Sequence, residues 1–77
     1  MYGEMVLLRQ EVNRNNRRIN DLIDKKIRWQ YSEHPNLSNV EIQQKLDSFD
    51  EEIDLLKKEI ESMLTEIRDI KRMMNSF

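Results

Sequence analysis

The chain has 77 residues, with 13 Lys and Arg against 15 Asp and Glu, one Gly, one Pro and no Cys. This length allows a single domain, and a core of this size rarely contributes more than about 3–5 kcal/mol to stability. No disulfide can form without Cys, and His34 is the only histidine, so no Cys/His set offers a structural metal site. Association between chains is the remaining source of stability.

The formal net charge of −2 is too small to indicate an acidic or a basic partner. The longest apolar run, Met5 to Leu8, is far too short to span a membrane. The N-terminus has neither the basic segment nor the long apolar core of a signal peptide. These features predict a cytoplasmic protein, or one inside a virus or a phage host.

The first predicted element is a helix over residues 4–33. Heptad spacing puts Asn15 at a core position, where a buried Asn typically fixes register or pairing. Proline disfavours helical geometry in the residue before it, so Pro35 predicts an end near Glu33. We interpret Ser32-Glu33-His34 as a C-terminal cap, because these side chains point in different directions. One face of the helix carries the apolar residues Met5, Leu8, Val12, Ile19, Leu22, Ile23 and Ile27.

A complete helix-start signal follows a turn at residues 34–38. Ser38-Asn39-Val40-Glu41 matches the S-x-x-E capping box, in which the serine hydroxyl accepts from the glutamate amide and the carboxylate reaches back. Leu37 and Ile42 stand at the positions of a hydrophobic staple. These signals predict that a second helix begins at Asn39.

The second predicted element, a helix over residues 39–76, carries an unbroken heptad stripe. Its steps alternate between four and three, a pattern typical of a coiled coil. At 1.5 Å per residue the stripe extends over about 54 Å of helix. The stripe consists of Ile42, Leu46, Phe49, Ile53, Leu56, Ile60, Met63, Ile67, Ile70, Met74 and Phe77.

The short connection requires the two helices to lie antiparallel. The predicted fold is therefore all-α, an antiparallel helical hairpin with a long heptad second helix that self-associates as a coiled coil or four-helix bundle. We expect a homodimer. Its parallel or antiparallel orientation stays open, although in a parallel pair of second helices Lys45 would attract Asp50, and Glu52 would attract Lys57. The predicted interface residues are Met5, Leu8, Ile53, Leu56, Ile60, Met63, Ile67, Ile70 and Met74.

Two surfaces of the predicted hairpin suggest partners. The open end carries additional apolar residues, and flexible methionines adapt to varied partners, so this end either packs between copies or docks another protein. A basic cluster could contact phosphates; it consists of Arg14, Arg17 and Arg18 with Lys25, Lys26 and Arg28. Because Asp21 and Asp24 interleave with these residues, we interpret the cluster as a solvated helix face and expect no nucleic acid. The additional apolar residues are Met1, Tyr2, Val6, Leu7, Leu64 and Met73.

The sequence contains no catalytic motif from which to derive an enzyme. Gly3 is the only glycine, so there is no Gly-rich phosphate loop, and no triplet of nucleophile, base and acid is visible. We expect no cofactor and no metal. The residues predict a non-catalytic protein–protein interaction module, acting as a small regulator or assembly factor.

The start of the second helix resembles a known family. Leu37-Ser38 with Glu41-Ile42 matches the L-S-x-x-E-[IV] opening of helix two in the small sporulation-regulating aspartyl-phosphate phosphatases of bacilli. Gln43 to Asp47 keeps the Gln, Leu and Asp of the family signature S-Q-E-L-D. An ungapped match instead places Ser48-Phe49-Asp50 on its E-L-D, so the position of the family aspartate stays open.

This resemblance implies an alternative function. The chain would dephosphorylate the receiver domain of a response regulator in sporulation control, by orienting water near the phospho-aspartate. The gapped match assigns the catalytic role to Asp47, with Gln44 one turn earlier. It also implies a response regulator as the partner.

Overall fold

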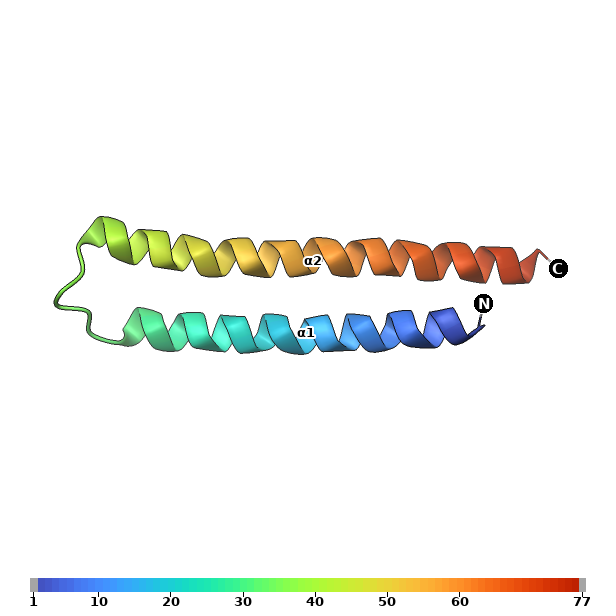
Figure 1. The fold of residues 1–77 in the computed structure, drawn as a ribbon, viewed down its shortest axis with the longest axis horizontal. Coiled ribbons are helices and arrows are strands. Elements are labelled where there is room, and N and C mark those ends of the chain that lie inside the picture. The colour runs from blue at the N-terminus through green and yellow to red at the C-terminus, as the bar shows by residue number, and fades with distance from the viewer. Residues whose placement is uncertain (1, 77) are drawn as a thin grey trace.

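The computed structural model describes residues 2–76 and contains, in that range, two helices and no strand. Helix α1 spans Tyr2–Tyr31 and helix α2 spans Asn39–Asn75. The helices lie side by side and antiparallel, with both termini at one end of a rod and the connection at the other (Figure 1). The rod measures 63 × 17 × 12 Å. The predicted all-α helical hairpin is therefore confirmed, while Met1 and Phe77 lie outside the described residues.

Helix α1 ends at Tyr31, two residues before the predicted end near Glu33. The Ser32 hydroxyl donates to a carbonyl oxygen one turn earlier at 2.7 Å, and His34 Nε2 bonds the Trp29 carbonyl oxygen at 2.7 Å. The His34 ring also stacks on the Trp29 ring, with the centroids 4.0 Å apart. The last carbonyls of a helix have no partner within it. These two side chains supply partners, so the predicted cap is confirmed for Ser32 and His34.

Helix α2 begins where the capping box predicts. The Ser38 hydroxyl accepts from the Glu41 backbone amide at 3.2 Å and donates to the Glu41 carboxylate at 3.1 Å. Ser38 itself has an extended backbone, with φ −75° and ψ 164°. Its carbonyl accepts the first helical bond, from the Ile42 amide at 3.0 Å. A local sequence signal therefore fixes the start of the long helix.

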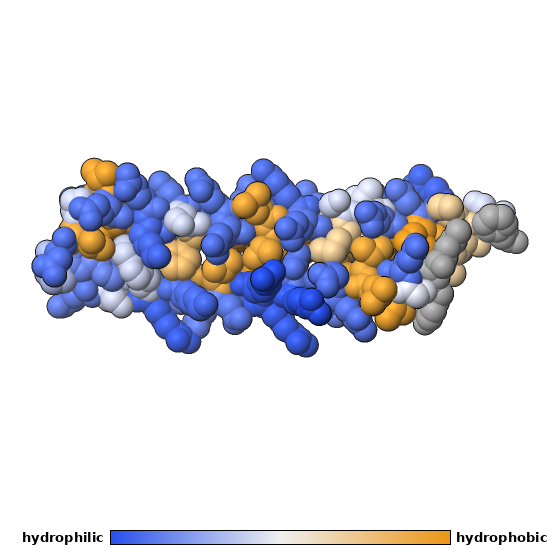
Figure 2. All heavy atoms as spheres, viewed as in Figure 1, coloured by the Kyte–Doolittle hydropathy of each residue, from blue (hydrophilic) through white to orange (hydrophobic). Residues whose placement is uncertain are grey.

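The core is a narrow seam between the helices, and Figure 2 shows apolar residues along this line with hydrophilic residues on both sides. In α2 the heptad residues from Ile42 to Ile70 are all buried or half-buried. Along α1 the residues that face α2 also recur at steps of three and four. They are Met5, Leu8, Val12, Asn15, Ile19, Leu22, Lys26 and Trp29. Both helices therefore contribute a heptad face, and the face of α1 includes two polar residues.

Two residues predicted for the buried face of α1 lie at its edge instead. Ile23 is 40% exposed and Ile27 is 47% exposed. Lys26 is half-buried and pairs with Asp50 across the hairpin. Lys26 follows Leu22 by four residues and Ile27 follows it by five, so heptad spacing rather than hydrophobicity decides which side chain faces α2.

The hairpin leaves much apolar surface outside the seam. Its accessible surface is 6322 Å², whereas a compact protein of this mass exposes about 5,000 Å². Within residues 2–76, neither helix has a stretch with the length and apolarity that a membrane crossing requires. The exposed large apolar residues are Val6, Leu7, Ile23, Ile27, Tyr31, Leu37, Val40, Leu55, Leu64, Met73 and Met74.

Candidate functional site

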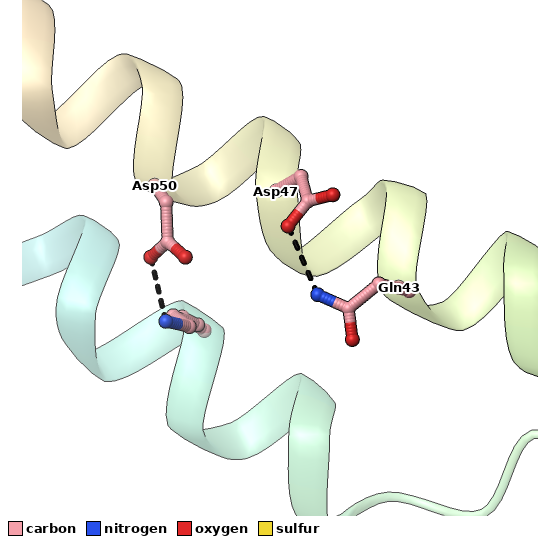
Figure 3. A network of polar contacts seen from close by, with 4 residues as sticks. Gln43, Asp47 and Asp50 are labelled. Carbon is pink, nitrogen blue, oxygen red and sulfur yellow. Dashed lines mark hydrogen bonds and ion pairs between the residues drawn. The ribbon is translucent and has the colours of Figure 1, made fainter.

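The predicted catalytic residues Asp47 and Gln44 are both exposed near the start of α2. The amide that holds the Asp47 carboxylate belongs to Gln43, whose Nε2 donates to Asp47 Oδ1 at 2.9 Å (Figure 3). Residues four apart on a helix lie on the same face, and Gln43 stands four residues before Asp47. Gln43, which the sequence did not single out, therefore positions the Asp47 carboxylate, and the catalytic role of Asp47 and Gln44 stays a prediction.

Asp50, the other candidate for the family aspartate, joins the two helices. Its Oδ1 lies 2.6 Å from Lys26 Nζ, and the two side chains are 56% and 28% exposed (Figure 3). Lys45, the residue expected to attract Asp50 across a parallel dimer, lies over the Phe49 ring, 5.3 Å from its centroid. Asp50 therefore has a structural role within the hairpin that Asp47 does not share.

Asp47, Asp50, Glu51 and Asp54 line a shallow depression on the side of α2. Exposed carboxylates of this kind accept hydrogen bonds and can orient a water molecule at the surface of a partner. Among residues 2–76, no group of three or more potential ligands is placed to hold a metal ion.

A groove between the helices is a second candidate site, which sequence reasoning missed. Its volume is about 510 Å³. Leu22 and Leu56 are half-buried seam residues, and Leu55 beside them is 61% exposed. The groove could have been predicted from the register between the two helices, because the register decides which side chains lie on the same side of the hairpin. The lining residues are Arg18, Asp21, Leu22 and Lys25 from α1, and Glu52, Leu55, Leu56 and Glu59 from α2.

A buried polar contact borders this groove. Asn15 is 3% exposed, and its Nδ2 donates to Glu59 Oε2 at 2.9 Å. A buried amide without a partner would lower stability, so we expect this contact to favour one alignment of the helices. The predicted core position of Asn15 is confirmed, and its effect on register stays a prediction. Together with the Lys26–Asp50 pair, the contact defines the levels at which α1 and α2 meet.

The predicted interface residues follow the seam and differ in how far it covers them. Met5, Ile53 and Ile67 are buried. Met74, near the open end, is 41% exposed. The half-buried members are Leu8, Leu56, Ile60, Met63 and Ile70. Most of these residues therefore retain surface that a second molecule could cover.

Comparison with known proteins identifies no relative. No family model, no curated protein and no solved structure matches the chain. The likeness to the sporulation phosphatases therefore depends on the residues at the start of α2 alone, and the function that it implies stays a prediction.

Proposed function

We propose that this chain is a coiled-coil protein–protein interaction module that forms a homodimer and acts as a non-catalytic regulator or assembly factor in the cytoplasm. The observation that carries the proposal is the incomplete coverage of the seam. In α2 the heptad stripe is unbroken, yet within it Ile60, Met63 and Ile70 are only half-buried. A heptad stripe normally packs into a matching surface along its length, and one neighbouring helix covers only one side of it.

The energetics of a small chain favour association. Full burial of a Leu, Ile or Met side chain contributes about 1.5–3 kcal/mol, and a hairpin with few buried side chains gains little of this alone. A stable interface buries roughly 800 Å² on each partner. The hairpin exposes 6322 Å², so such an interface needs only a small part of its surface. A second copy is the simplest partner that completes the core.

The aspartyl-phosphate phosphatase is the second candidate function. The observation that favours it is the exposure of Asp47, whose carboxylate is positioned by Gln43. Such a carboxylate could orient water near a phospho-aspartate on a response regulator. The interaction module has more support, because exposed apolar residues occur along both helices while only this carboxylate pattern supports catalysis.

Thermal unfolding at several protein concentrations tests the proposal. When folding is coupled to association, the unfolding midpoint rises with protein concentration. Circular dichroism follows the unfolding. We expect the unfolding midpoint to rise clearly between low and high micromolar protein concentrations. A midpoint that is independent of concentration would show that the hairpin folds alone and would contradict the proposal.

A further inference from the structure

We propose that the groove between α1 and α2 packs against the same groove of a second copy, with the two hairpins parallel so that both connections lie at the same end. This inference rests on the proposed self-association and adds to it the face and the orientation. Three observations carry it: the charges on the rim, the register of the helices and the exposure of Leu55.

The two sides of the groove differ in charge. On the α1 side the rim carries Arg18 and Lys25, with Asp21 between them, and on the α2 side it carries Glu52 and Glu59. Within the described part of the chain, Arg18, Lys25 and Glu52 make no ion pair within 4.0 Å. These three charged groups are therefore free to pair with another molecule.

The contacts between the helices set the level of each charge along the rod. Asn15 contacts Glu59, and Lys26 contacts Asp50. A residue of α1 and a residue of α2 at the same height along the rod therefore have numbers that add to about 75. Arg18 therefore lies close to the level of Glu59. By the same rule, Lys25 lies close to the level of Glu52.

Most homodimers have a two-fold axis, which makes the shared surface complementary to itself. An axis along the rod exchanges α1 and α2 at the same level. It places Arg18 opposite Glu59 of the second copy, and Lys25 opposite Glu52 of the second copy. Both contacts attract, and symmetry repeats each of them.

A two-fold axis that is perpendicular to the rod and passes through the groove brings like charges together instead. It lays α1 on α1 and reverses the direction, so Arg18 would face Lys25 of the second copy. Glu52 would likewise face the second copy's Glu59. Both contacts repel, and like charges across an interface oppose association. The charge layout therefore selects the parallel arrangement.

The apolar residues of the groove fit the same arrangement. Leu55 is 61% exposed in the hairpin, and its level corresponds to that of Leu22 on α1. With the axis along the rod, Leu55 approaches Leu22 and Leu56 of the second copy. The contact then has an apolar centre and a charged rim, which is the usual anatomy of a protein interface.

Charge reversal with mixing of variants tests the groove contact. We expect Lys25→Glu and Glu52→Lys each to weaken the homodimer by about ten-fold, measured as the dissociation constant, because two symmetry-related contacts become repulsive. An equimolar mixture should recover near wild-type affinity as a heterodimer, since each reversed residue then meets an opposite charge. Arg17→Glu, on the exposed outer face of α1, is the matched control and should leave affinity unchanged.

Each outcome of this experiment has a distinct meaning. The crosswise arrangement predicts that Lys25→Glu strengthens the dimer, because residue 25 would then attract Arg18. A parallel pair of second helices predicts that Lys25→Glu has no effect. Either result, or a failure of the mixture to recover affinity, would overturn the inference and leave self-association standing. A wild-type chain that is monomeric at all concentrations would overturn both the inference and the proposed function.

A distance measurement tests the orientation without altering the groove. The chain has no cysteine, so Asn36→Cys gives one spin label per chain, placed in the connection. Packed helix axes lie about 8–10 Å apart, so parallel hairpins should bring the two labels within about 30 Å. In the crosswise arrangement the axis lies midway between Arg18 and Lys25, about 14 residues from the label on each copy, so at 1.5 Å per residue the labels would lie about 45 Å apart. A label separation of about 45 Å or more would overturn the inference.

Discussion

Replacing either residue of the Asn15–Glu59 contact should change stability, but in opposite directions. Asn15 is 3% exposed and its amide donates to Glu59 at 2.9 Å. Glu59→Ala leaves the buried amide without its acceptor, and we expect the free energy of unfolding to fall by about 1–3 kcal/mol. Asn15→Leu removes the buried amide instead and leaves an exposed glutamate that water can solvate. It should raise stability by about 1–2 kcal/mol through added apolar burial.

The double variant Asn15→Leu/Glu59→Ala separates the two effects. With no buried amide left to satisfy, it should be nearly as stable as Asn15→Leu, which gives a coupling energy of about 1–3 kcal/mol. Urea unfolding followed by circular dichroism measures these values. All variants need the same protein concentration, because association changes apparent stability.

Glu61→Ala is the matched control for Glu59→Ala. Both glutamates are exposed on α2, but Glu61 lies outside the groove, and the buried amide of Asn15 bonds Glu59. The control should change stability by no more than about 0.5 kcal/mol, as is usual for exposed positions. Equal losses for Glu59→Ala and Glu61→Ala, or a double variant as unstable as Glu59→Ala alone, would refute the reasoning.

Three further changes test the cap, the seam and the alternative function. Ser38→Ala should lower stability by about 0.5–2 kcal/mol without changing the oligomeric state, and unaltered thermal unfolding would mean that the cap is not needed. Ile60→Asp should dissociate and largely unfold the protein, because it places an unpaired charge in the seam; a folded dimer would count against the proposed packing. Asp47→Ala should stay within about 0.5 kcal/mol of wild type, and phosphorylated receiver domains should keep their label with either chain. A loss of label that requires Asp47 would favour the phosphatase.

The turn and the start of α2 were predictable because their signals are local. The Ser38 hydroxyl reaches a backbone amide three residues away, so the four letters of the capping box suffice. The signals that end α1 are also local, but they are hydrogen bonds from side chains to the last backbone carbonyls of the helix. Ser32 and His34 take carbonyls of the last turn, and the helix ends at Tyr31, before Pro35 would require it.

The buried face of α1 was predicted only in part, because hydrophobicity and heptad spacing disagree there. Ile27 is more apolar than Lys26, yet Lys26 occupies the heptad position and Ile27 is 47% exposed. Hydrophobicity alone therefore predicts that Ile27 is buried, although its neighbour Lys26 is the residue that faces α2. Asn15, by contrast, was assigned from spacing, and it is buried.

The groove depends on geometry that a linear pattern does not carry. It requires the alignment of α1 against α2, which the contacts of Asn15 and Lys26 establish. The bond from Gln43 to Asp47 is local, because residues four apart share a helix face. The four-residue spacing therefore favoured Gln43 over Gln44 as the partner of Asp47.

Sedimentation equilibrium of the wild-type chain tests self-association most directly. The 9.4 kDa chain should sediment with twice its monomer mass at micromolar concentrations and dissociate on dilution. Dissociation should accompany a loss of helical signal, because the hairpin has few buried side chains of its own. A fully helical monomer of 9.4 kDa across the whole range would contradict the proposed function.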